Sequence, residues 1–310
     1  MSSPTPGRRP PKTVLGLVCS PRRLGNSECV LKEICRHLPE EHELKLIRLS
    51  DLDIQPCRAC YTCLSETRSC PLDDDLEDLI QELCQADGII VAAPTYFLGP
   101  NGQLKNLLDR GLSLSIHAHR LWKKPAVGVG IAGISGKEGY TLLGIESFLK
   151  LILADLKQVA VVYGALPGEA LLSSETKATA RDLAKALFGR AATPQPSCPL
   201  CGGQTFRFLD ETTVRCMLCS NLGRMRVADG RTSFEITRSE HELFLSLADV
   251  QAHHDWLRQM KDRFRAQRRD LLAVCREYRQ DGVWVQARRA GAGSPHDPDK
   301  DGFPGGESGS

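Results

Sequence analysis

The stretch that decides the fold is "TVLGLVCSPRRLGNSECVLKEICRHL", residues 13–38. It opens with an apolar run at residues 13–19, which is typical of a buried β-strand. A Ser-Pro turn follows, and residues 27–38 then have the spacing of an amphipathic helix. The apolar residues on one face of that helix are Val30, Leu31, Ile34 and Leu38. A strand, a loop and a helix therefore follow one another at the start of the chain.

The same alternation continues along the chain. Strands are expected at residues 43–50, 88–96, 125–134 and 158–166, and helices at residues 74–86, 103–114, 140–156 and 174–190. Buried parallel strands need helices on both faces of their sheet, so the pattern predicts an α/β fold with a doubly wound, five-stranded parallel sheet. In such sheets ligands bind beyond the carboxyl ends of the strands. The loops after the first, third and fourth strands should therefore carry the function.

The chain divides further by composition. The expected parts are a disordered N-terminus at 1–12, the α/β domain at 13–190, a small cysteine-paired module at 191–230, a helical extension at 231–289 with one long helix at about 248–279, and a disordered tail at 290–310. The end of the chain has almost nothing apolar to bury, which is why we expect it to be disordered.

The composition also narrows the classes of partner. The 310 residues contain 40 Lys and Arg against 38 Asp and Glu, a formal net charge of +2, so a nucleic acid is not expected as the main partner. No run approaches the ~18 apolar residues of a membrane span, and no apolar stretch of a secretory signal follows the N-terminus. We therefore expect a cytoplasmic protein with no membrane partner. In that compartment, clustered cysteines indicate metal binding or redox chemistry.

The loop after the first strand suits an anion. It reads "CSPRRLGNSE" and leads into a helix, whose first backbone N–H groups form an anion site. The side chains of Ser20, Asn26 and Ser27 can add donors. The loop matches neither the Walker A pattern nor G-x-G-x-x-G, and an ordinary strand-to-helix turn is the alternative interpretation.

The loops after the third and fourth strands suit a flat ligand. Tyr96 and Phe97 follow Pro94, and an aromatic ring there could stack on a ligand or merely cover the end of the sheet. The next loop, "GISGKEGY" at 133–140, has enough glycine for its backbone to approach a ligand closely.

Together these loops resemble those of the flavodoxin-like NADPH-dependent FMN reductases. That family has an S-P-R-x-x-G-N-S phosphate loop, a P-x-Y-x-G flavin loop leading into a G-Q-L-K-x-x-x-D-R helix, and a glycine-rich third loop. The resemblance implies FMN as cofactor and NAD(P)H as electron donor. The cofactor-binding residues that it implies are Ser20, Arg22, Gly25, Asn26, Ser27, Pro94, Thr95, Tyr96, Phe97, Gly133, Ser135 and Gly136. One departure from the family is Cys19, where glycine is frequent.

A compact set of cysteines follows the second strand. Cys57, Cys60, Cys63 and Cys70 have the spacing C-x2-C-x2-C-x6-C, and Pro71 comes next. Bacterial ferredoxins use a similar start and also place proline after the last cysteine, so this spacing favours an iron–sulfur cluster. Zinc, a disulfide or free thiols are the alternatives, although structural zinc usually takes two well-separated C-x2-C pairs.

At this position the chain resembles the iron–sulfur flavoproteins, a branch of the same family. The resemblance implies one FMN and one [4Fe–4S] cluster, the latter on Cys57, Cys60, Cys63 and Cys70. It also implies a homo-oligomer, a dimer or a tetramer, in which flavin and cluster approach each other across a subunit interface.

The second cysteine set reads as a zinc ribbon. Cys198 with Cys201, and Cys216 with Cys219, form two C-x2-C knuckles separated by a spacer that fits a β-hairpin. A rubredoxin-like iron site has the same two knuckles and is the rival interpretation.

The last helix carries an apolar stripe with 3-4 spacing, interrupted at Gln267. We expect this stripe to pack against the domain or a partner subunit. The stripe consists of Leu257, Met260, Phe264, Leu271, Val274 and Tyr278. The pair His253 and His254 has no cysteine nearby in the sequence and is expected at the surface.

Two functions follow from these patterns. The first is an oxidoreductase that passes electrons from NAD(P)H or a reduced carrier through FMN and a [4Fe–4S] cluster to an acceptor. The alternative is a redox-responsive binding module, in which the ribbon and the basic last helix hold a nucleic acid or a protein.

Overall fold

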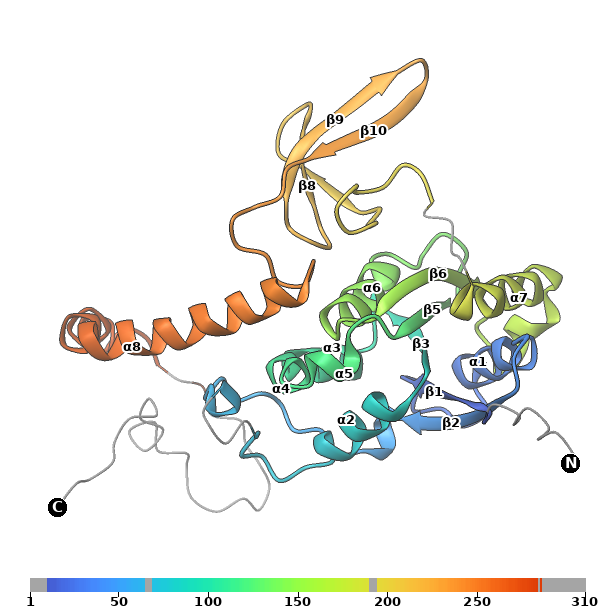
Figure 1. Cartoon of the computed structure of the whole chain (residues 1–310), viewed down its shortest axis with the longest axis horizontal. Helices are drawn as coiled ribbons and strands as arrows, with labels where there is room; N and C mark the ends of the chain where they lie inside the picture. Colours follow the sequence, from blue (N-terminus) through green and yellow to red (C-terminus); the bar gives the residue numbers. More distant parts are fainter. Residues whose placement is uncertain (1–9, 65–68, 190–193, 284, 286–310) are drawn as a thin grey trace, which may run out of the picture.

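The computed structural model of the protein describes residues 10–64, 69–189, 194–283 and 285. It confirms the predicted α/β architecture, and adds a small antiparallel sheet and a long C-terminal helix (Figure 1). The tails expected at 1–12 and 290–310 fall outside the described residues, apart from residues 10–12. Lys12 is in fact the first residue of a strand. Within the described residues, no helix has both the length and the apolar character needed to cross a membrane.

Five parallel strands form the main sheet, in the order β2-β1-β3-β5-β6. They are β1 (Lys12–Val18), β2 (His42–Arg48), β3 (Gly88–Tyr96), β5 (Pro125–Ala132) and β6 (Asp155–Tyr163). The short strand β4 (Gly99–Pro100) pairs antiparallel with the end of β3. The chain moves outward from β1 to β2 and then crosses to β3 on the other side of β1, so the strand order reverses between β1 and β3. A ligand crevice is expected at the carboxyl ends of these two strands.

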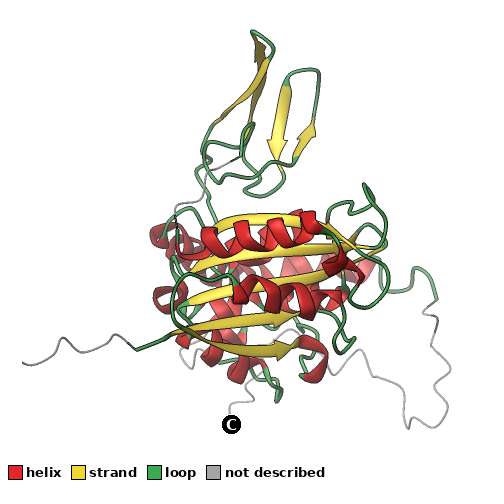
Figure 2. Ribbon diagram, turned by 90° about the vertical axis from the view of Figure 1, so that its right-hand side faces the viewer, coloured by secondary structure: helices red, strands yellow, loops and turns green. Residues whose placement is uncertain are grey.

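Helices cover both faces of this sheet (Figure 2). One face carries α1 (Asn26–Arg36) and α7 (Ser174–Phe188). The other carries α2 (Leu76–Gln85), α3 (Gly102–Asp109), α4 (Gly111–Ser115), α5 (Ala118–Leu121) and α6 (Thr141–Leu151). Three 3-10 turns complete the domain: η1 (Leu49–Asp51), η2 (Thr62–Leu64) and η3 (Glu169–Leu172).

Strand β1 shows why the sheet has two cores. Leu15 and Leu17 point into one core, whereas Val14 and Val18 point into the other, and all four side chains are essentially inaccessible to solvent. Successive side chains of a strand face opposite sides, so an uninterrupted apolar run is what a sheet covered on both faces requires.

The second cysteine set belongs to a separate antiparallel sheet in the order β10-β9-β8-β7. Its strands are β7 (Phe206–Phe208), β8 (Thr213–Cys216), β9 (Leu222–Ala228) and β10 (Arg231–Ile236). The sheet thus continues past residue 230, where the sequence placed the end of the ribbon. Asp229 and Gly230 both have positive φ and form the turn between β9 and β10, as expected for an Asp-Gly hairpin.

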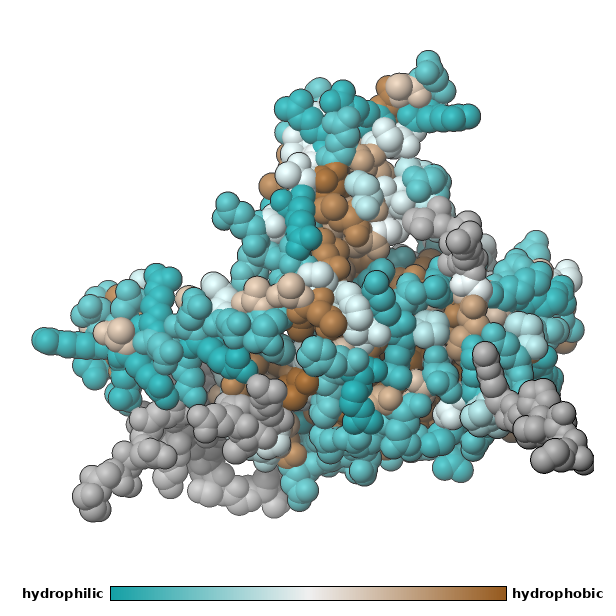
Figure 3. All heavy atoms as spheres, viewed as in Figure 1, coloured by the Kyte–Doolittle hydropathy of each residue, from teal (hydrophilic) through white to brown (hydrophobic). Residues whose placement is uncertain are grey.

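The ribbon is joined to the α/β domain by a third apolar cluster. Leu153 and Ala118 of the domain share this cluster with ribbon residues such as Val214 and with Phe244. Figure 3 shows apolar side chains running from the ribbon down to the domain. Helix α8 (Leu247–Glu277) follows this junction and extends beyond the domain (Figure 1).

Helix α6 is shorter than expected from the sequence. It ends at Leu151, whereas the sequence predicted helix up to residue 156. Leu153 has a φ of +68°, which ends the helical path, and β6 then begins at Asp155 to pair with β5.

Candidate cofactor and metal sites

The loop after β1 is held in shape by a buried ion pair. Arg48 on β2 donates to the carbonyls of Ser20 and Arg22 at 3.0 and 3.1 Å, and to the Glu28 carboxylate at 2.6 Å. The Glu28 carboxylate also accepts from the backbone N–H of Leu24 at 2.9 Å. These bonds from Arg48 therefore fix the conformation of the loop. The loop leads into the first N–H groups of α1, where an anion can bind.

The pKa of Glu28 reflects this pairing. Burial alone would raise the pKa, but the hydrogen bonds from Lys32, Arg48 and the Leu24 N–H outweigh it and lower the pKa from 4.5 to about 2. Glu28 is only 6% exposed, and its carboxylate can keep its charge there because these donors compensate for the loss of water.

The side chain of Asn26 bonds to the protein backbone and not to the space where a ligand was expected. Its amide nitrogen donates to the carbonyls of Gly164 and Leu166, both at 2.9 Å, and its side-chain oxygen accepts from the Ala170 N–H at 3.3 Å. These bonds tie the first loop to the segment after β6. The expectation that the Asn26 side chain donates to an anion is therefore corrected, because its amide nitrogen already donates to two carbonyls and holds the loop in place.

The second and third loops form one unit. The Tyr140 N–H donates to the Leu98 carbonyl at 2.7 Å, and the hydroxyl groups of Thr95 and Thr141 are 2.8 Å apart. Gly139 lies so close that an added Cβ would be 2.1 Å from the Leu98 oxygen, so only glycine fits there.

Aromatic side chains project from this unit into solvent. Phe97 is fully exposed and Tyr96 half-exposed, although large aromatic side chains are usually buried in good part. Phe97 and Leu98 both have positive φ, which is uncommon for residues other than glycine and indicates a strained backbone in this loop. In the third loop, Gly133, Ser135 and Gly136 are exposed, and Gly136 also has positive φ.

The first cysteine set lines a single pocket of about 370 Å³. Cys57, Cys60, Cys63 and Cys70 all border it, together with Pro56, Tyr61, Leu72, Arg110 and Ser113. Two of the thiols already accept a hydrogen bond from the loop, since the Ala59 N–H reaches Cys57 Sγ at 3.4 Å and the Thr62 hydroxyl reaches Cys60 Sγ at 3.3 Å. The pocket far exceeds the ~30 Å³ of one water molecule.

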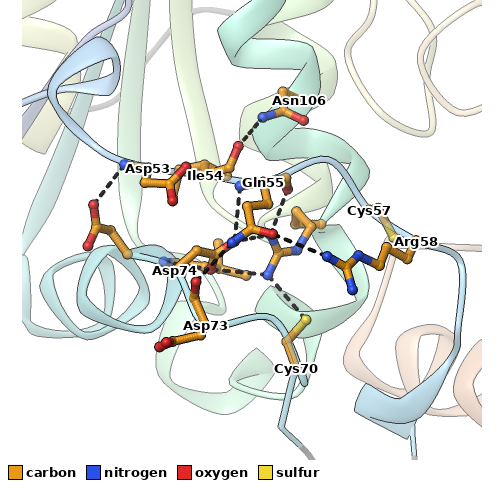
Figure 4. A network of polar contacts seen from close by, with 12 residues as sticks. Asp53, Ile54, Gln55, Cys57, Arg58, Cys70, Asp73, Asp74 and Asn106 are labelled. Carbon is orange, nitrogen blue, oxygen red and sulfur yellow. Dashed lines mark hydrogen bonds and ion pairs between the residues drawn. The ribbon is translucent and has the colours of Figure 1, made fainter. Parts of the chain in front are cut away.

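Arg110, which lines this pocket, belongs to a buried ion pair that the sequence did not reveal, and Figure 4 shows the network of polar contacts around it. Arg110, where α3 meets α4, donates to the Asp74 carboxylate at 2.5 and 3.3 Å, to the Gln55 carbonyl at 2.7 Å, and to Cys70 Sγ at 3.1 Å. Both charged side chains are 1% exposed. Burial opposes the charge on Asp74, but the bonds from Arg110 outweigh it and lower the pKa of this carboxyl.

The second cysteine set has a different geometry. The Sγ atoms of Cys198, Cys201, Cys216 and Cys219 all lie within 4.8 Å of one another and are buried. Cys198 and Cys219 are 3.8 Å apart, and Cys201 and Cys216 are 3.5 Å apart. Four sulfurs at about 2.3 Å from one tetrahedral ion would be about 3.8 Å apart, so this set fits a single metal ion.

Within the described part of the chain, no other group of three or more such ligands is as compact. The four thiols around the large pocket are thus less closely gathered than the second cysteine set.

Helix α8 begins against the first cysteine loop. Arg258 Nε donates to the Leu64 carbonyl at 3.2 Å, and His254 Nε2 lies 2.6 Å from the Ser115 hydroxyl. His254 is buried, so the expectation that it lies at the surface was wrong. Its neighbour His253 is half-buried and contacts His241 at 2.9 Å.

The predicted apolar stripe of α8 is only partly covered. Leu257, Met260 and Phe264 are half-buried, whereas Leu271, Val274 and Tyr278 are exposed. Packing against the domain is thus confined to the first part of the helix.

Comparison with known proteins agrees with this architecture. The family model described as NADPH-dependent FMN reductase matches residues 13–145. An iron–sulfur flavoprotein of Methanocaldococcus jannaschii is 33% identical over 183 residues, which cover 56% of this chain and 93% of that protein. An iron–sulfur flavoprotein of Methanosarcina thermophila is 29% identical over 140 residues, which cover 44% of this chain and 73% of that protein.

A solved structure of a flavone reductase has the same fold. It superposes with a TM-score of 0.64 at 18% identity and covers 89% of this chain and 99% of its own. The likeness in fold therefore extends beyond the α/β domain into the C-terminal part. The chain belongs to the flavodoxin-like NADPH-dependent FMN reductase family, in its iron–sulfur flavoprotein branch, and is an FMN-dependent oxidoreductase.

The Glu28 pair predicts a pH dependence of stability. The pKa of Glu28 is lower in the folded chain than in the unfolded one, so its stabilisation is complete above about pH 4.5 and is lost as the pH falls toward 2. Between about pH 6 and about pH 3, the wild type should lose about 2 kcal/mol more free energy of unfolding than Glu28→Gln.

Urea unfolding at both pH values measures this difference. The control is Glu175→Gln, which removes an exposed carboxylate from the first turn of α7. Equal losses in the wild type and Glu28→Gln would show that the pair with Arg48 does not form in solution.

Proposed function

We propose that this protein passes electrons from NAD(P)H or a reduced carrier through FMN and a [4Fe–4S] cluster to an acceptor. The observation that carries the proposal is the pocket of about 370 Å³ that four thiols and a buried cation line, in a chain with an FMN-reductase fold. When bound, FMN takes up a hydride and can release its two electrons singly, whereas a cluster of this type exchanges one electron at a time.

The three loops at the carboxyl edge would hold the FMN. In this proposal the first N–H groups of α1 and the hydroxyl groups of Ser20 and Ser27 bind the phosphate, as anions bind at other helix N-termini. Tyr96 and Phe97 offer aromatic faces for the flat ring. The remaining contacts come from Arg22, Gly25, the backbone of Asn26, Pro94, Thr95, Gly133, Ser135 and Gly136.

The thiols of Cys57, Cys60, Cys63 and Cys70 would hold the cluster. Thiolates are the usual ligands of iron–sulfur clusters, and donors near the sulfurs are a usual second shell. Such donors are already present, Ala59 and Thr62 on the loop and Arg110 between α3 and α4. The residues present therefore fit this group.

The proposal also includes a homo-oligomer, a dimer or a tetramer, in the cytoplasm. The exposed Tyr96 and Phe97 support it, because a second subunit could cover these aromatic side chains together with the flavin. The redox-responsive binding module is the competing function, and it would need the ribbon and α8 to bind a partner without pyridine nucleotide oxidation.

For the second cysteine set, Cys198, Cys201, Cys216 and Cys219, we propose a structural zinc. The sulfur spacing and the Gly203 N–H that donates to Cys201 Sγ at 3.4 Å support a closed tetrahedral site. Cys216→Ser should remove about one equivalent of zinc and unfold the ribbon while the FMN content stays unchanged, because metal binding supplies much of the folding energy of such small modules.

Metal analysis and flavin content of the purified variant measure this outcome, with the exposed Cys275→Ser as control. Loss of iron in place of zinc from Cys216→Ser would support the rubredoxin-like site.

Cys63→Ser tests the electron path. Serine is a poor ligand for iron, so the variant should lose its cluster and retain FMN. Reduction of a quinone, which accepts two electrons, should continue, whereas reduction of a one-electron carrier such as cytochrome c should fall by more than about tenfold.

Cys275→Ser is again the control, and the oligomeric state of each variant is checked by size-exclusion chromatography. Unchanged one-electron transfer in a variant shown to lack iron would contradict the proposed path and favour the binding module.

A further inference from the structure

The side chain of Arg110 reaches the first cysteine set from the interior of the protein. Its guanidinium group is almost completely buried and donates to Cys70 Sγ at 3.1 Å. The other donors that reach these sulfurs are neutral: the Ala59 N–H and the Thr62 hydroxyl on the loop, and the Ser113 side chain on α4. Among the described residues, Arg110 is thus the charged donor to this set.

The position of the guanidinium is fixed by groups other than the thiol. Asp74 and the Gln55 carbonyl accept three of its hydrogen bonds. Asp74 is itself held by the backbone N–H groups of Gln55 at 3.0 Å and Leu76 at 3.2 Å. The donor therefore stays beside Cys70 whatever the charge on the sulfur. A group that is to influence a reduction potential has to be held in place in this way.

The charge balance around Cys70 has two opposing parts. The Arg110 cation and its N–H stabilise negative charge on the sulfur, and an iron–sulfur cluster gains one negative charge on reduction. The Asp74 anion, bonded to the same guanidinium, cancels part of that effect. Because both groups are buried, solvent screens neither of them well.

We propose that Arg110 and Asp74 together set the reduction potential of the cluster, Arg110 raising it and Asp74 limiting the rise. The inference rests on the proposed [4Fe–4S] cluster at Cys57, Cys60, Cys63 and Cys70. The couple concerned is the one-electron reduction of the cluster by the reduced flavin, with no bond made or broken at Arg110. Arg110 is a positioning residue in this account, since it acts through Cys70.

Two substitutions should shift the potential in opposite directions. Arg110→Gln removes the cation, so the reduced cluster is stabilised less and the potential should fall. Asp74→Asn removes the compensating anion and leaves the cation in place, so the potential should rise. A general loosening of the loop cannot produce opposite shifts from the two variants.

The experiment is an anaerobic redox titration of the purified holoprotein, followed by the electron paramagnetic resonance signal of the reduced cluster. Flavin and iron contents are measured on each sample, so that folding and cluster loading are known. Arg110→Lys keeps the charge and should restore part of the potential lost in Arg110→Gln.

The matched control is Arg58→Gln. Arg58 lies between Cys57 and Cys60 and lines the same pocket, but it is exposed to solvent. Removing this cation should shift the potential much less than Arg110→Gln does, because water screens its charge. If Arg110→Gln does not retain iron, Asp74→Asn decides the outcome, because only a rise in its potential agrees with the proposal.

The results separate this inference from the proposed function. Wild-type protein that binds FMN but no iron would overturn the cluster and the inference with it. A wild-type cluster whose potential is unchanged in Asp74→Asn and Arg110→Gln, or is shifted in the same direction by both, would overturn only the role of Arg110 and Asp74.

Discussion

The buried ion pair between Arg110 and Asp74 is the contact on which the first cysteine site depends. It lies between the two ends of the cysteine loop, with Gln55 before the first cysteine and Asp74 after the last (Figure 4). Asp53 and Asp75 pair through their backbones beside it, and Asn106 of α3 donates to the Ile54 carbonyl at 2.6 Å. Burying two charges is costly unless their hydrogen bonds are satisfied, and here the partners are supplied by both ends of the loop and by the α3–α4 junction. The fold therefore fixes the base of the loop, whose thiols then share one pocket.

The two cysteine sets differ in their geometry and in their surroundings. Cys198, Cys201, Cys216 and Cys219 are buried and lie close together, in an apolar cluster that they share with side chains of the small sheet. Cys57, Cys60, Cys63 and Cys70 are more widely spaced, are partly exposed and lie next to a cation. The C-terminal part is not independent of the first cysteine set, since α8 contacts the cysteine loop through Arg258 and Leu64. A movement of α8 would thus be transmitted to the first cysteine set through this contact.

The sequence was sufficient where the physics is local or periodic. The five strands were recognisable because strands buried on both faces are uninterrupted apolar runs, as in 88–93, and both cysteine sets were recognisable from spacing alone. The role of Arg110 was not, because it depends on Asp74 and Gln55, which are distant in sequence. The side chain of Asn26 was assigned to a ligand because its three backbone partners lie more than a hundred residues away. Strand β10 was missed because the β9–β10 hairpin is largely exposed and has only a short apolar alternation, although its Asp-Gly turn could have indicated it.

The central claim is that one chain holds a flavin, an iron–sulfur cluster and a separate structural metal. Metal, sulfide and flavin analysis of wild-type protein purified without oxygen, together with its visible spectrum, tests this most directly. The account predicts about four iron and four sulfide, one FMN and one zinc per chain, with the broad absorption of a cluster beneath the flavin bands. Zinc at both cysteine sites with no iron, in protein that has bound its FMN, would contradict it.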